Sequence, residues 1–81
     1  MKIPEIKRLV ENFSLEDLIL TEKNLLNEEP LLIEVNGIDE GEKLTHIIAA
    51  IWSKNQLEEN KNFTINEVIR NYTLKIRNTI N

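Results

Sequence analysis

The sequence predicts an all-α protein, a compact bundle of about four helices with one short extended segment before the third helix. Two observations carry this prediction. Hydrophobic residues recur with the period of a helix along most of the chain, and a capping residue, Ser14, Asp39 or Thr64, precedes three of these stretches. Only residues 31–35 alternate with the period of two that is typical of a strand.

The first two helices are expected on either side of Ser14. Residues 1–13 hold a hydrophobic stripe and a proline, Pro4, at a position that a first turn tolerates. Ser14 can cap the second helix, which ends at 27–30 because the residue before Pro30 is pushed out of the helical region. The junction at Phe13 and Ser14 is either a kink or a tight corner. The stripes are Ile3, Ile6, Leu9, Val10 and Phe13, then Leu15, Leu18, Ile19, Leu25 and Leu26.

Leu31–Val35 is the one segment with strand character. Leu31, Ile33 and Val35 alternate with Leu32 and Glu34 before an Asn-Gly turn signal. A single strand is not stable alone. The segment therefore either crosses the helices as an extended connection or pairs with the same segment of a second subunit.

The central helix is expected over residues 39–57. Asp39 and Glu42 form a capping box in which each side chain accepts from the other residue's backbone N–H. The stripe that follows is widened by two alanines and a tryptophan, so this helix needs a neighbour on each flank. Its hydrophobic residues are Leu44, Ile47, Ile48, Ala49, Ala50, Ile51 and Trp52.

The last helix is expected to begin after a solvated loop at 58–62. Thr64 and Glu67 form a second capping box, and Phe63 stands where a hydrophobic staple to Val68 is expected. A stripe continues nearly to the end of the chain, through Ile65, Val68, Ile69, Tyr72, Ile76 and Ile80. A helix this long can overhang a small domain, which hints at a partner subunit.

Composition bounds the class of protein. At 81 residues, with 41% hydrophobic and 30% charged residues, the chain is one domain, residues 1–81, that buries only about 60% of its unfolded surface. It has no cysteine, hence no disulfide or thiolate chemistry. No hydrophobic run approaches the roughly 20 residues that span a membrane, and the N-terminus does not resemble a signal peptide. We therefore expect a cytoplasmic protein without membrane association.

Few residues in the chain suggest chemistry. There is one histidine, no nucleophile elbow around a serine and no phosphate-binding glycine loop, so we expect no enzyme and no cofactor. Glu42 and His46 share a helix face and could bind a divalent metal, especially if a dimer axis doubled them. The alternative is that Glu42 caps the helix and His46 is a polar or half-buried helix residue.

Charge is unevenly distributed along the chain. Residues 28–42 contain six acidic residues and no basic one, whereas the last helix carries Arg70, Lys75 and Arg77 against Glu67. The net charge of −4 disfavours nucleic-acid binding. We expect instead that the basic helix meets the acidic segment, within one chain or across a dimer. A subunit interface is predicted at Ile48, Trp52, Tyr72 and Ile76, since aromatic residues are enriched at interfaces.

The chain resembles a set of small uncharacterised bacterial helical proteins. The resemblance covers about the last 50 residues and implies a compact, dimeric helical fold with no known activity. The residues that carry it are Ile33-Glu34-Val35, Gly37, Asp39-Glu40-Gly41-Glu42, Leu44-Thr45-His46, Ala49-Ala50, Arg70-Asn71-Tyr72 and Ile76-Arg77-Asn78.

The function predicted from these features is a non-enzymatic interaction or regulatory module that acts as a homodimer, with a further protein partner as a possibility. Two alternatives stand beside it. One is a metal or small-ligand binder that uses Glu42 and His46, and the other is a DNA-binding regulator that uses the last helix.

Overall fold

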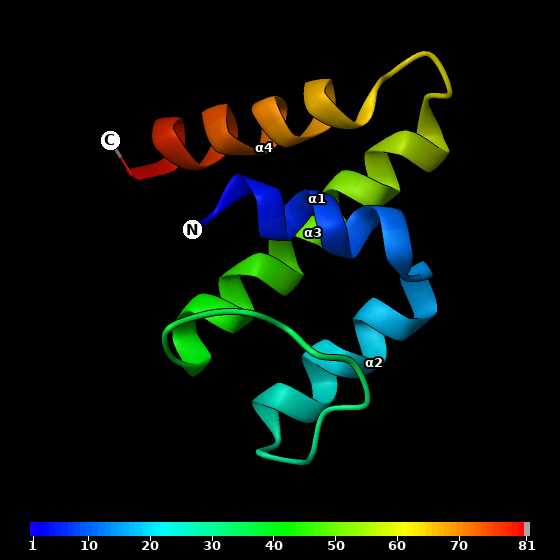
Figure 1. Ribbon diagram of the computed structural model, residues 1–81. Coiled ribbons are helices and arrows are strands. Elements are labelled where there is room, and N and C mark those ends of the chain that lie inside the picture. The colour runs from blue at the N-terminus through cyan, green and yellow to red at the C-terminus, as the bar shows by residue number, and fades with distance from the viewer. Residues whose placement is uncertain (81) are drawn as a thin grey trace.

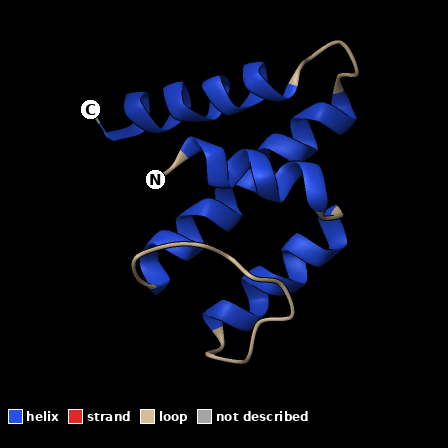
Figure 2. Ribbon diagram, viewed as in Figure 1, coloured by secondary structure: helices blue, strands red, loops and turns tan. Residues whose placement is uncertain are grey.

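The computed structural model describes residues 1–80, and the side chains of residues 1–77. Over this range the chain forms four helices and no strand, which confirms the predicted all-α class (Figure 2). They are α1 (Ile3–Asn12), α2 (Leu15–Leu26), α3 (Glu40–Glu59) and α4 (Ile65–Ile80).

The central helix α3 contacts each of the other three helices (Figure 1). Ile47, Ala49 and Ala50 are buried at these contacts. The sequence predicted two neighbours for this helix, and the fold supplies three from the same chain. The broad hydrophobic surface of α3 is therefore largely covered within one subunit.

The junction between α1 and α2 is a tight corner. Phe13 has extended backbone angles (φ −131°, ψ 151°), and the Ser14 hydroxyl accepts from the Asp17 backbone N–H at 3.1 Å. This is the cap that the sequence predicted. The side chains of Leu18 and Thr21 then turn inward and are buried.

The two later capping boxes differ. In α4, Thr64 and Glu67 exchange both predicted bonds, at 3.0 and 3.2 Å. In α3, Asp39 accepts from the Glu42 N–H at 2.8 Å, but Glu42 accepts from Ile38 rather than from Asp39. The predicted reciprocal bond was wrong by one residue, because the Glu42 carboxylate lies between the Ile38 N–H and the Met1 amino group, 3.5 Å away.

Helix ends also depart from the prediction. Glu58 and Glu59 continue α3 rather than opening a loop, since glutamate is a good helix former, and the Asn60 N–H closes the last turn on the Gln56 carbonyl. Ile80, the last residue of the predicted stripe, lies outside the described side chains.

Residues 27–39 form a long connection from α2 to α3, here called the acidic loop, that runs across these two helices (Figure 1). The predicted alternation is present: Val35 is buried, Leu31 and Ile33 pack against the core, and Leu32 and Glu34 are exposed. The segment is an extended connection within this chain. Its pairing with a second subunit stays a prediction.

Candidate functional site

A cluster of buried polar groups holds the acidic loop to the helices. Glu5, in the first turn of α1, is only 6% exposed. Its carboxylate accepts two hydrogen bonds from Arg8, at 2.7 and 2.8 Å, and two from Asn36, at 2.8 and 3.0 Å. The bonds from Arg8, and then those from Asn36, lower the Glu5 pKa from 4.5 to about 2 against the opposing effect of burial.

Asn36 is the residue of the loop on which these contacts converge. Its backbone N–H and side-chain amide both donate to Glu5, and its carbonyl lies 2.8 Å from Nδ1 of His46. Two residues earlier, the Glu34 carbonyl accepts from Arg8 Nη2 at 2.7 Å. Hydrogen bonds with residues of α1 and α3 therefore hold the loop in place.

His46 is completely buried in α3. Because a carbonyl can only accept, Nδ1 carries the proton and donates to Asn36, while Nε2 accepts from the Lys2 N–H at 2.8 Å. A neutral imidazole satisfies both partners. His46 thus joins the start of α1 to the acidic loop, and both of its ring nitrogens are in use.

Glu42 lies one turn before His46 in α3, with its carboxylate engaged elsewhere. The hydrogen bond from the Ile38 N–H is the main cause that lowers the Glu42 pKa, and the Met1 amino group adds to it. Glu42 and His46 therefore stabilise the protein terminus and the loop, and do not face a common vacant position. Among residues 1–77, no group of three His, Cys, Asp or Glu is placed to hold a metal ion.

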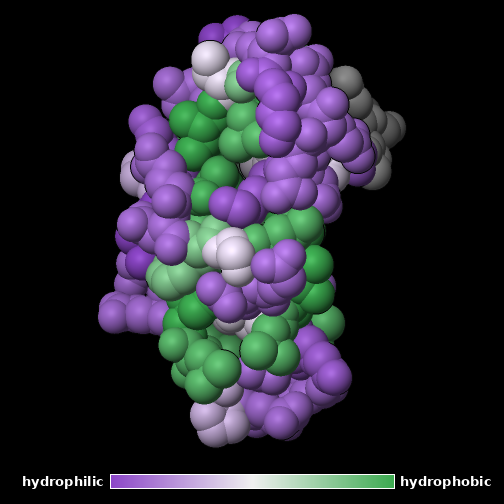
Figure 3. Space-filling model, turned by 90° about the vertical axis from the view of Figure 1, so that its right-hand side faces the viewer, coloured by the Kyte–Doolittle hydropathy of each residue, from purple (hydrophilic) through white to green (hydrophobic). Residues whose placement is uncertain are grey.

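Among the described residues, the two large hydrophobic side chains that are most exposed both lie on the acidic loop. Leu32 is 80% exposed and Ile38 is 83% exposed. Exposed hydrophobic residues also gather over α2, where Ile19, Leu20 and Leu26 lie, and Figure 3 shows hydrophobic surface over this part of the molecule. Loops that are fixed in place yet display hydrophobic groups are typical of recognition surfaces.

The residues of the predicted interface lie at the packing of α3 against α4. The rings of Trp52 and Tyr72 are 5.6 Å apart between centroids, with their planes at 54°. Tyr72 is 7% exposed, Trp52 and Ile76 are half-buried, and Ile48 is 39% exposed. Tyr72, Trp52 and Ile76 pack in the core of one subunit, whereas Ile48 is exposed, and the role of the four in an interface stays a prediction.

The acidic loop and the basic helix α4 lie at opposite ends of the molecule (Figure 1). The expectation that they meet within one chain is therefore wrong, because α1 and the middle of α3 stand between them. The acidic loop and α4 can therefore complement each other in charge only through contact between two chains.

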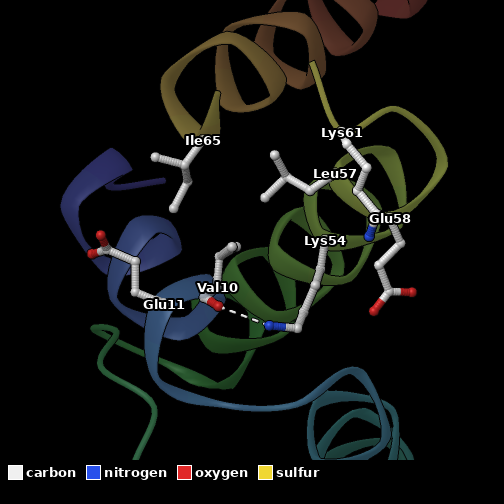
Figure 4. Close-up of a pocket in the computed structure, with 7 residues that line it drawn as sticks. All are labelled: Val10, Glu11, Lys54, Leu57, Glu58, Lys61 and Ile65. Atoms are coloured by element: carbon white, nitrogen blue, oxygen red, sulfur yellow. Dashed lines mark hydrogen bonds between the residues drawn. The ribbon is translucent and has the colours of Figure 1, made fainter. Parts of the chain in front are cut away.

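Two of the cavities that border α1 also border α4. One, of about 330 Å³, has the hydrophobic wall Val10, Leu57 and Ile65, and its rim carries Glu11, Glu58, Lys54 and Lys61, with Lys54 Nζ donating to the Val10 carbonyl at 3.0 Å (Figure 4). The two acidic and two basic residues on its rim cancel in charge, so the cavity does not favour a ligand of either charge. The other, of about 300 Å³, lies between the start of α1 and α4 and is lined by Ile3, Asn66, Ile69, Arg70 and Thr73.

Sequence reasoning missed Glu5, Arg8 and Asn36. The spacing of Glu5 and Arg8, three residues apart on a helix, is a signal for the ion pair. No sequence signal links either residue to Asn36, which is about 30 positions further along the chain.

Comparisons with known proteins place the chain in a family. Neither the curated proteins nor the solved structures contain a match. No helix among the described residues is long and hydrophobic enough to cross a membrane. A family model matches all 81 residues, a wider span than the resemblance seen in the last 50. The chain therefore belongs to the family of unknown function DUF6952.

Proposed function

We propose that the protein is a non-enzymatic interaction module that acts as a homo-oligomer, and that the acidic loop is its recognition surface. The observation that carries this proposal is that hydrogen bonds hold the loop in place while Leu32, on the same loop, is exposed. A buried carboxylate and a buried imidazole are used to fix an irregular segment whose outward side chains are hydrophobic and acidic.

The energetics support this interpretation. Burying polar groups such as Glu5 and His46 costs free energy unless every partner is in place, and here the partners are in place. A loop fixed in this way loses little further conformational freedom when it binds. Leu32, exposed on such a loop, gains more from association than the same side chain on a mobile segment.

The other candidate functions have less support. The side chains of Glu42 and His46 are committed to backbone partners, so no observation favours the metal-binding alternative. Arg70 and Arg77 share one face of α4, which is too small a basic surface to favour DNA over a protein partner.

Sedimentation equilibrium of the wild-type protein over a range of concentrations tests the proposal. We expect reversible self-association that Leu32→Gln weakens. Leu20→Gln is the matched control, because Leu20 is also an exposed leucine but lies on α2. A wild-type protein that stays monomeric up to about 1 mM, where binding would be negligible, contradicts the proposal. Weakening by Leu20→Gln alone would contradict the choice of the loop.

A further inference from the structure

The chain itself has a surface that fits the acidic loop, the groove between α1 and α4. We propose that the loop of one copy docks into the groove between α1 and α4 of a second copy, with Leu32 in the groove and the neighbouring acids beside Arg70 and Arg77. This inference rests on the proposed self-association and names the surface that completes it.

The groove has the right lining for a leucine. Its volume is about 300 Å³, and its hydrophobic side is formed by Ile3, which is half exposed, and Ile69. Nothing in the described part of the chain covers Ile3 fully. A leucine side chain from another molecule would bury this surface together with its own.

The rim of the groove carries the complementary charge. Arg70 lines it, and Arg77 follows seven residues later on the same face of α4. Glu67, the acid nearest to Arg70 on this helix, is held in the Thr64 capping box, whose hydrogen bonds are the main cause that lowers the Glu67 pKa, and the charge of Arg70 adds to this effect. The groove thus has a hydrophobic floor and one guanidinium group, that of Arg70, in its lining.

The loop presents the matching pattern. Leu32 and Glu34 point outward two residues apart on the extended segment, and Glu28 and Glu29 precede them on the surface. No basic residue occurs from 28 to 42. In the proposed contact, a hydrophobic side chain flanked by acids meets a hydrophobic groove lined by Arg70, with Arg77 two turns further along α4, and like charges oppose alternative contacts between two loops.

The loop and the groove are different surfaces of the molecule, so a contact between them is head to tail. Each copy then offers one loop and one groove. Head-to-tail contacts build rings where the rotation closes and open chains where it does not. The average mass should therefore rise beyond that of a dimer as concentration increases.

Two complementary variants test the pairing of surfaces. Arg70→Glu/Arg77→Glu reverses the charge beside the groove and keeps the loop, while Leu32→Gln/Glu29→Gln removes the loop contact and keeps the groove. Each variant alone should associate at least about tenfold more weakly than the wild type, because each retains only half of the contact. Circular dichroism of both variants checks that they stay helical.

Mixing the two variants is the decisive measurement. The groove variant still has a loop and the loop variant still has a groove, so an equimolar mixture should form a capped heterodimer of 1:1 composition that does not grow further. Leu20→Gln/Glu16→Gln, the same chemical change on α2, should associate like the wild type.

The outcomes separate this inference from the proposed function. If the wild type associates and the loop variant does not, but Arg70→Glu/Arg77→Glu associates normally, the loop is a recognition surface and the groove is not its partner. If the mixture of variants forms no heterodimer, the head-to-tail contact is overturned. A monomeric wild type overturns both proposals.

Discussion

Glu5 is the residue on which the position of the acidic loop most depends. Its carboxylate accepts four hydrogen bonds, two from Arg8 in its own helix and two from Asn36 in the loop. Such charge-assisted bonds are stronger than neutral ones, and an ion pair that is largely buried fails badly when one partner is removed. The position of the loop is therefore linked to the ionisation of one carboxyl group.

The Glu5 pKa gives this link a pH dependence. The folded value of about 2 lies below the ordinary value of 4.5, so the ionised carboxylate stabilises the fold above pH 4.5 and this contribution is lost as pH falls from 4.5 toward 2. The difference corresponds to about 3 kcal/mol. We expect Glu5→Gln to lower the free energy of unfolding by about 2–3 kcal/mol at pH 7 and by much less at pH near 2.

Urea denaturation of both proteins at pH 7 and at low pH measures this difference. Glu11→Gln is the control, since Glu11 is an exposed carboxylate of the same helix. A penalty for Glu5→Gln that is equal at both pH values would show that the amide loses packing rather than charge.

Ser53, in contrast to Glu5, is a buried polar residue whose side chain has no hydrogen-bond partner. Its hydroxyl is fully buried in α3 and has no hydrogen-bond partner in the structure. An unpaired buried hydroxyl costs free energy, and alanine is a better helix former of similar size. We expect Ser53→Ala to stabilise the protein by about 1 kcal/mol, which raises the Tm by about 4–8 °C.

Differential scanning calorimetry of Ser53→Ala is best read beside Ser14→Ala. The same substitution at Ser14 removes the α2 cap and should destabilise by about 1 kcal/mol. A lower Tm for Ser53→Ala would mean that its hydroxyl is paired in solution.

These residues also mark what a sequence can predict. His46 was predicted either as a metal ligand or as a polar helix residue, and the structure makes it a buried connector. Its environment depends on Lys2 and Asn36, which are 44 and 10 residues away. Periodicity and capping signals are local, so they do not report contacts of this kind.

The elements themselves were largely predictable, because each helix start carries its own signal. Ser14 and Thr64 cap α2 and α4 as expected. The end of α2 was predicted for an incomplete reason. Besides Pro30, it ends in a Schellman motif: the Glu28 N–H donates to the Leu25 carbonyl and the Glu29 N–H to the Asn24 carbonyl.

Glu28 occupies the position in this motif that usually holds glycine. Its φ of 58° is the one positive φ among the non-glycine residues described, and a side chain there costs about 1 kcal/mol. We expect Glu28→Gly to stabilise the protein by roughly 0.5–1 kcal/mol. The sequence has no glycine at position 28 to indicate this helix end, so the motif could not be predicted from it.

Chemical denaturation of Glu28→Gly and Glu29→Gly separates the two effects. Glu29 does not share the positive φ, so glycine there only adds freedom to the unfolded chain and should destabilise. Equal effects of the two substitutions would argue that residue 28 is not held in the left-handed conformation.

At the scale of the whole molecule, one chain covers most of the hydrophobic surface of α3 without a second subunit. The sequence suggested one because the last helix is long enough to overhang the domain and because α3 has a broad hydrophobic surface for a chain of 81 residues. Three helices of the same chain surround it, so Ile47, Ala49 and Ala50 need no partner. A sequence gives the number of hydrophobic positions on a helix, but not the number of neighbours that the fold will bring to it.

The separation of acidic and basic residues along the molecule favours association between copies. Acidic residues gather in the loop at one end of the molecule, and Arg70 and Arg77 lie on α4 at the other, where Arg70 lines a groove. Exposed charges attract each other over about 10 Å at 0.1 M salt and about 3 Å at 1 M salt. A head-to-tail contact built on Leu32 and these charges should therefore weaken with salt without vanishing.

We expect the self-association of the wild type to weaken about tenfold between low and high salt, since exposed ion pairs are screened while burial of Leu32 is not. In Arg70→Glu/Arg77→Glu the charges of loop and groove repel each other, so added salt should instead strengthen its weak association. Analytical ultracentrifugation across a salt series measures both slopes. Slopes of the same sign for the two proteins would mean that the acidic loop does not approach Arg70 and Arg77 in the assembly.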